Sequence, residues 1–117
     1  MKIGFAGSDN FSLKILSGLM DIIPDSSLSL SLVLTIPPKN QGRGKTLTES
    51  PVSSFSKKNN LFMQTIAPGR YVVDSLEDRI SKLDYLIVAS FGYILNENIL
   101  SLPKHGCINV HPSLLPK

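Results

Sequence analysis

The sequence predicts an α/β domain in which helices cover both faces of a parallel β-sheet. Strand-like and helix-like stretches alternate along the chain with short links, and residues 85–89 are continuously apolar, as central parallel strands are. The length of 117 residues suits one compact domain. Charged residues make up 18% and hydrophobic residues 42%, which excludes an intrinsically disordered chain.

The first strand and helix follow from the opening residues. Residues 1–6 are apolar and end at Gly7, and residues 8–10 are all of types that start helices. Apolar side chains then recur at helical spacing until Pro24 stops the helix. The residues on that face are Phe11, Ile15, Leu16, Leu19, Ile22 and Ile23.

A second strand, a loop and a second helix are predicted next. Leucine and serine alternate along residues 27–34, which is typical of a strand with one face of small side chains. Residues 37–45 contain two prolines and two glycines and predict a loop. Ser50 followed by Pro51 predicts the start of a helix that ends near Lys58.

The second half of the chain completes the sheet. Strands are predicted at residues 61–65, 85–89 and 107–110, and helices at residues 74–82 and 96–102. Ligands of such sheets bind beyond the carboxyl ends of the strands. The segments to inspect for a site are therefore residues 7–10, 36–45, 90–93 and 109–116.

Several kinds of site and location are excluded or disfavoured. A single cysteine, Cys107, excludes a disulfide framework and a cysteine-rich zinc site, and we expect no metal. The turn at residues 7–11 has one glycine where a dinucleotide fingerprint needs three, and residues 42–45 do not fit a Walker loop. No apolar run could span a membrane, and the chain is strand-like from its first residues, so we expect a cytoplasmic protein without a membrane partner. The net charge of +3 permits a polyanionic partner without requiring one.

Asn109 and His111 form the most informative polar pair. Residues two apart on a strand point to the same side, so both side chains can converge at the strand's end. An amide donor beside a tunable acid is suited to stabilising an oxyanion and transferring a proton, although a hydrogen-bonded structural pair is an alternative. Residues 112–116 would add an apolar wall beside them.

Three segments carry a resemblance to the formyltransferases. Residues 107–116 resemble the signature in which asparagine and histidine precede a Ser-Leu-Leu-Pro turn. Residues 2–11 resemble the family's first strand and turn, with Asp9 and Asn10 in place of the usual proline and aspartate. Residues 41–52, which contain Gly-Arg-Gly-Lys, resemble the loop of the methionyl-tRNA formyltransferases in particular.

The resemblance implies a Rossmann-like sheet of the formyltransferase N-terminal type and an enzyme of translation initiation. The formyl group of 10-formyltetrahydrofolate would move to the amino group of initiator methionyl-tRNA. Asn109 and protonated His111 would stabilise the oxyanion, and His111 would protonate the departing folate nitrogen. Arg43 and Lys45 would hold the tRNA acceptor end, the alternative for their loop being a solvated basic turn. The residues implied to line the folate site are Ser113, Leu114, Leu115 and Pro116.

The resemblance also implies that the domain is incomplete. The family's sequence continues into further strands and an aspartate that pairs with the histidine, and its full-length members carry a C-terminal barrel-like domain that binds tRNA. We therefore expect residues 1–117 to be the N-terminal part of a catalytic domain, with little transferase activity alone and residues 107–110 at a sheet edge. We expect the full-length protein to be a monomer.

Two other functions remain open, as do the roles of several residues. The chain could belong to a related formyltransferase that acts on a sugar or nucleotide amine, or it could be a non-catalytic remnant that binds folate or RNA. His105 is interpreted as a surface histidine and Cys107 as a packing thiol. The turn at Phe91-Gly92-Tyr93 either shapes the folate pocket or forms a packing corner.

The basic loop generates a prediction about tRNA binding. Arg43→Ala should weaken the binding of tRNA and lower the slope of log affinity against log salt by about one, because one phosphate contact is lost. Binding measured over a range of salt concentrations checks this. An unchanged slope would mean that the loop faces solvent.

Overall fold

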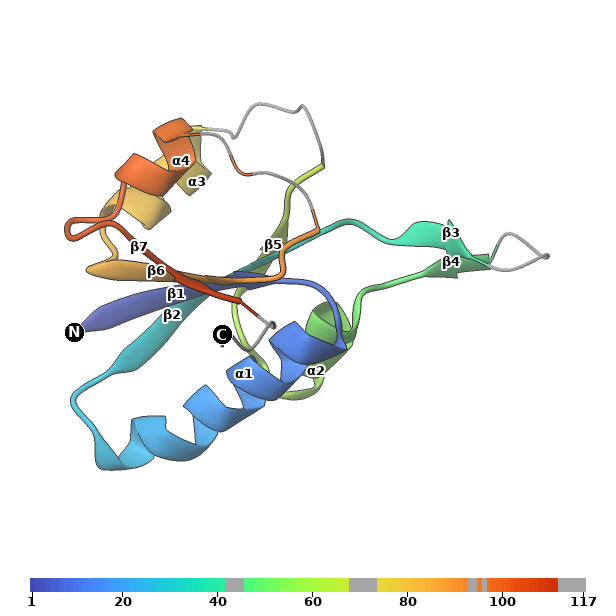
Figure 1. Ribbon diagram of the computed structural model, residues 1–117, viewed down its shortest axis with the longest axis horizontal. Helices are drawn as coiled ribbons and strands as arrows, with labels where there is room; N and C mark the ends of the chain where they lie inside the picture. The colour runs from blue at the N-terminus through green and yellow to red at the C-terminus, as the bar shows by residue number, and fades with distance from the viewer. Residues whose placement is uncertain (42–45, 68–73, 93–94, 96, 112–117) are drawn as a thin grey trace, which may run out of the picture.

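Five parallel strands form the central sheet, in the order β5-β2-β1-β6-β7 (Figure 1). The computed structural model describes residues 1–41, 46–67, 74–92, 95 and 97–111. The strands of the sheet are β1 (Lys2–Gly7), β2 (Ser29–Thr35), β5 (Met63–Thr65), β6 (Tyr85–Ala89) and β7 (Cys107–Val110). All four pairings between neighbours are parallel, which confirms the predicted sheet.

Helices cover both faces of this sheet, as predicted. Figure 1 shows α1 and α2 on one face and α3 and α4 on the other. Their bounds are α1 (Asn10–Ile22), α2 (Pro51–Lys58), α3 (Asp74–Ser81) and α4 (Glu97–Ser101), and a short 3₁₀ turn, Ile23–Asp25, follows α1. Each face has its own apolar cluster, with Phe5, Leu16 and Val52 on the α1 side and Leu86 and Ile80 on the α3 side. Successive strand residues enter opposite clusters, because side chains alternate across a strand.

Side-chain caps set the starts of α1 and α2. The Asp9 carboxylate accepts a hydrogen bond from the Ser12 backbone at 2.9 Å, and the Ser50 hydroxyl accepts one from the Ser53 backbone at 3.0 Å. Each cap satisfies a backbone N–H that has no partner within the helix. The polar residues from which the sequence predicted these two starts therefore act as expected.

The strand predicted at residues 27–34 is confirmed as β2 (Ser29–Thr35), and its carboxyl half is buried on both faces. Its first residues follow the expected pattern, but Val33 and Thr35 are fully buried along with Leu32 and Leu34. The strand lies between β1 and β5, and both helical layers cover its carboxyl half. A strand that is covered on both faces has no solvent face for small polar residues.

The predicted loop at residues 37–45 contains a short strand, which pairs with a second strand just after the loop in an antiparallel hairpin. Strands β3 (Lys39–Gln41) and β4 (Thr46–Thr48) pair from Lys39 with Thr48 to Gln41 with Thr46. Figure 1 shows this hairpin projecting away from the helices and the main sheet. Its strands are short and mostly polar, so they lack the apolar alternation from which a strand is predicted.

Strand β7 lies at an edge of the sheet, as predicted. It pairs with β6 on one side, and Ile108 is 46% exposed. Within the described residues no strand pairs with its other side. The backbone groups on that side are therefore available to a partner strand or to solvent.

The close approach of β1 to β6 generates a stability prediction. A Cβ atom added at Gly7 would lie 2.6 Å from the Ala89 carbonyl oxygen and 2.6 Å from Ser12 Cβ. Gly7→Ala should therefore lower the free energy of unfolding by about 1–3 kcal/mol, because the backbone must shift to admit the methyl group. Urea denaturation measures the change.

Gly18→Ala is the matched control. Gly18 lies within α1, where an added Cβ would meet nothing within 4 Å. This substitution should raise the free energy of unfolding by about 0.5–1 kcal/mol, since alanine favours the helix. Equal destabilisation by the two substitutions would contradict the assigned crowding at Gly7.

Candidate active site

All four segments singled out in the sequence begin at the carboxyl edge of the sheet, and three of them follow the adjacent strands β1, β6 and β7. Gly7 is in register with Ala89, and Ala89 is in register with Val110. The residues that follow these strand ends are Ser8, Ser90 and His111. The strand register therefore places the ends of β1, β6 and β7 side by side.

A compact polar network joins the first two of these ends. The Ser8 backbone N–H donates to the Ser90 carbonyl oxygen at 3.1 Å, and the Ser12 hydroxyl lies 3.0 Å from the same oxygen. The Ser12 hydroxyl also contacts the Ala89 carbonyl oxygen, and the Ser90 hydroxyl donates to Asp9 Oδ2. The start of α1 is thus tied to the turn after β6.

Asp9 is the charged member of this network. Burial raises the pKa of its carboxyl. Hydrogen bonds from the Ser90 hydroxyl and from the backbone and hydroxyl of Ser12 together lower it by more, so the pKa lies below the ordinary value of 3.8. The carboxylate is therefore ionised at neutral pH. Sequence reasoning identified Asp9 only as a helix-start residue. The sequence did contain a signal for the network, because Ser12 lies three residues after Asp9 and a serine follows β6.

The turn after β6 packs tightly against β1 and β2. Ser90 has a φ of +55° and Gly92 a φ of +104°, which is a conformation that favours glycine at residue 92. A Cβ atom added at Gly92 would lie 3.2 Å from Ser8 Oγ and 3.6 Å from Ile36 Cγ2. Phe91 is buried in the apolar cluster on the α3 and α4 side. Of the two interpretations of this turn, a wall of the folate pocket or a packing corner, the burial of Phe91 favours the packing corner.

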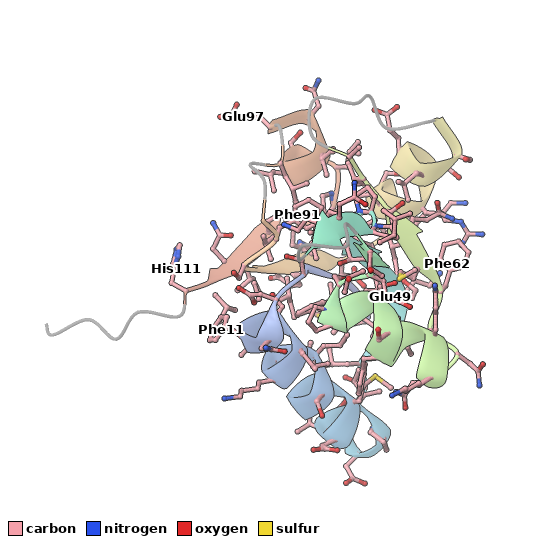
Figure 2. All side chains as sticks on the ribbon, turned by 90° about the vertical axis from the view of Figure 1, so that its right-hand side faces the viewer. Phe11, Glu49, Phe62, Phe91, Glu97 and His111 are labelled. Atoms are coloured by element: carbon pink, nitrogen blue, oxygen red, sulfur yellow. The ribbon has the colours of Figure 1, made fainter. Side chains whose placement is uncertain are left out.

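Asn109 and His111 lie at the end of β7 and are both exposed. Figure 2 shows the His111 side chain on the outside of the molecule, whereas Phe91 is buried. Within the described part of the chain the two polar side chains form no hydrogen bond to each other. An exposed amide and an exposed imidazole at the carboxyl edge are accessible to a ligand.

The other predicted site residues cannot be placed in this geometry. Arg43 and Lys45, predicted to bind tRNA, lie outside the described residues. Tyr93 lies outside them as well. The same holds for the whole predicted folate set, Ser113, Leu114, Leu115 and Pro116.

The surroundings of the two remaining candidates, His105 and Cys107, agree with the roles predicted for them. The His105 side chain is 56% exposed, with its ring 5.3 Å from that of Tyr85, which confirms a surface histidine. The Cys107 thiol is partly buried and lies 3.1 Å from the Leu100 carbonyl oxygen, and burial raises its pKa. A protonated thiol in this position is a packing group, as predicted.

The described residues include neither a metal-binding cluster nor a membrane-spanning helix. No group of three or more histidine, cysteine, aspartate or glutamate side chains is placed to hold a metal ion in this part of the chain. No helix among the described residues is long and apolar enough to cross a membrane.

A cavity of about 320 Å³ lies on the same edge of the sheet, beside the ends of β1 and β2. It is bounded by the start of α1, the base of the β3–β4 hairpin and the start of α2. Its lining residues are Ser8, Asn10, Ile36, Lys39, Thr48, Glu49, Ser50 and Pro51. The carboxyl edge therefore offers two places for a ligand, this cavity and the corner at Asn109 and His111.

The lowered pKa of Asp9 predicts how stability depends on pH. A carboxyl whose pKa is lower in the folded state stabilises the fold above its unfolded pKa, and this contribution is lost as the pH falls through the folded pKa. Between pH 7 and pH 3 the original chain should therefore lose more unfolding free energy than Asp9→Asn, which keeps a capping side chain. Urea denaturation at a series of pH values measures this.

Ser90→Ala is the companion variant for this test. It removes the hydroxyl that donates to Asp9 Oδ2. The pH-dependent loss of stability should then be smaller than in the original chain. Parallel pH curves for all three proteins would show that the network does not stabilise the ionised carboxylate.

The chain is similar to known proteins along its whole length. The methionyl-tRNA formyltransferase of Ehrlichia canis is 40% identical over 120 residues, and that of Anaplasma marginale is 41% identical over 119 residues. Both alignments cover all of this chain but only 38% of the relative's length. The family model described as "Formyl transferase" matches residues 1–117. The chain therefore belongs to the formyl transferase family.

Proposed function

We propose that this chain is the N-terminal part of a catalytic domain that transfers a formyl group from 10-formyltetrahydrofolate to the amino group of initiator methionyl-tRNA. The reaction belongs to translation initiation in the cytoplasm, and the full-length protein acts as a monomer. The observation that carries the proposal is the position of Asn109 and His111 at the carboxyl end of β7, in line with the ends of β1 and β6. Family membership and the names of the relatives support the type of reaction.

Asn109 and His111 act on the reacting formyl group. The amino nitrogen attacks the formyl carbon, and the C=O π electrons move to oxygen as the new C–N bond forms. The Asn109 amide and protonated His111 donate hydrogen bonds to the resulting oxyanion. When the C–N bond to folate breaks, His111 donates its proton to the departing nitrogen, and the attacking amine loses a proton to water.

The two ligands approach this corner from different segments. Ser113, Leu114, Leu115 and Pro116 line the folate site in this proposal. Arg43 and Lys45, between strands β3 and β4, bind the phosphates of the tRNA acceptor end. The described strands of the hairpin support this second assignment, because they project from the sheet (Figure 1).

A chimera tests the proposal, since the chain spans 38% of the length of the Ehrlichia relative. Residues 1–117 are joined to the segment that follows the aligned region in that relative, and formylation of methionyl-tRNA is measured. Asn109→Ala and His111→Ala should each lower the rate by about a hundredfold or more, because a donor to the oxyanion is lost.

Matched substitutions outside the corner serve as controls. Asn98→Ala on α4 and His105→Gln on the surface remove the same side-chain types and should leave the rate nearly unchanged. A chimera that formylates a sugar or nucleotide amine but not methionyl-tRNA would identify the related formyltransferase. Binding of the formyl donor without any turnover would identify a non-catalytic remnant.

A further inference from the structure

Glu49, whose carboxylate is fixed by contacts with α2, is one of the residues that line the cavity beside β1 and β2. Glu49 accepts a hydrogen bond from the Ser53 hydroxyl at 2.7 Å and forms an ion pair with Lys57 at 3.3 Å. Its side chain is 34% exposed. The Ser53 hydrogen bond and the Lys57 ammonium outweigh partial desolvation and hold the pKa of Glu49 below its ordinary value. The group is therefore ionised at neutral pH and held in place by Ser53 and Lys57.

This carboxylate retains capacity to accept further hydrogen bonds. Both the Ser53 hydroxyl and the Lys57 ammonium bind the same oxygen, Oε1. An ionised carboxylate offers about four lone-pair sites on its two oxygens. The Ser54 side chain supplies a further hydrogen bond that lowers the pKa of the carboxyl, and lone-pair sites for a ligand's donor remain beside these three partners.

The rest of the lining combines an apolar surface with a positive charge. Ile36 and Pro51 provide apolar surface, and Asn10 contributes an amide at the start of α1. Lys39, at the base of the hairpin, brings an ammonium group to the same cavity. A ligand that matches these groups has a planar ring for the apolar surface, an N–H donor for Glu49 and a phosphate for Lys39.

The position of the cavity relates it to the proposed reaction. It lies between the β3–β4 hairpin, which carries Arg43 and Lys45 between its strands, and the corner formed by Asn109 and His111. Figure 2 shows Glu49 and His111 on well-separated parts of the molecule, so one small group cannot contact both. An RNA strand held by the hairpin would pass the cavity before its end reached the corner.

We propose that the cavity binds one nucleotide of the acceptor RNA whose base carries an exocyclic amine, as cytosine and adenine do. Glu49 accepts a hydrogen bond from that amine, Ile36 and Pro51 contact the base, and Lys39 binds a phosphate. This rests on the proposed function for the identity of the RNA. The volume of about 320 Å³ is at the lower end for ligand sites, which suits a single nucleotide.

The carboxylate gives this cavity its selectivity. Uracil and hypoxanthine carry a carbonyl oxygen where cytosine and adenine carry the amine. That oxygen would face the Glu49 carboxylate, acceptor against acceptor, with no hydrogen bond to offset the desolvation of either group. Bases with an exocyclic amine should therefore bind more tightly than their oxo counterparts.

Titrations with mononucleotides test the proposal on the 117-residue chain itself. Cytidine monophosphate is compared with uridine monophosphate, and adenosine monophosphate with inosine monophosphate, by NMR chemical shifts of the labelled protein. In at least one pair the amino nucleotide should bind about fivefold or more tightly, with shifts at the start of α1 and α2.

Two substitutions separate the base contact from the charge contact. Glu49→Gln, whose amide can also donate a hydrogen bond, should reduce the preference within each pair to less than about twofold. Lys39→Ala should weaken both members of a pair equally and leave their ratio unchanged. Glu97→Gln on α4 and Lys104→Ala, before β7 and at the opposite edge of the sheet, are exposed and outside the lining, so they are the charge-matched controls.

Each outcome decides the proposal. Equal affinity within both pairs, a preference that survives in Glu49→Gln, or no binding at 10 mM nucleotide (about 3 kcal/mol of binding free energy) would overturn it. Because the titrations involve no formyl transfer, they are independent of the proposed function. A chimera that formylates methionyl-tRNA while the chain shows no base preference would leave the proposed function in place and remove only this inference.

Discussion

The contact between the carboxyl ends of β1 and β6 is the constraint on which the candidate site depends. Gly7 has no side chain, so the Ala89 carbonyl oxygen and Ser12 can approach its backbone closely. The Ser12 hydroxyl, the Asp9 carboxylate and Ser90 then satisfy the polar groups at this junction. Removing a donor or acceptor from such a junction would leave buried backbone oxygens without a partner, which is costly. One junction therefore fixes both the start of α1 and the turn after β6.

From this junction the arrangement extends outward in both directions along the edge. On one side β7 pairs with β6, which brings Asn109 and His111 into line with Gly7. On the other side Gly92 approaches Ile36 at the end of β2, and the buried hydrogen bond of 2.7 Å between Thr35 and Ser50 ties β2 to the start of α2. The two ligand positions are therefore held by the same rigid sheet, although no side chain contributes to both.

The features that the sequence predicted well depend on local chemistry. Capping residues at Asp9 and Ser50 defined the starts of helices, and continuous apolar residues defined β6. The features that it predicted poorly depend on long-range packing. The second buried face of β2 arises from two helical layers that are distant in the sequence, and the polar network joins residues 77 to 82 positions apart. The spacing of Asn109 and His111 indicated a shared site, but only the strand register placed it beside Gly7.

The separation of the two ligand positions bears on which kind of acceptor the edge can serve. The cavity lies at the ends of β1 and β2, and β7 is two strands from β1 and three from β2, which at about 4.8 Å per strand is about 10–14 Å. A single amino sugar is shorter than this span and therefore occupies one position at a time. An extended RNA end can occupy both, and contacts remote from the reacting atoms can then help to orient the amine. A fixed carboxylate at the distant position would serve an extended acceptor and would contribute nothing to a small one.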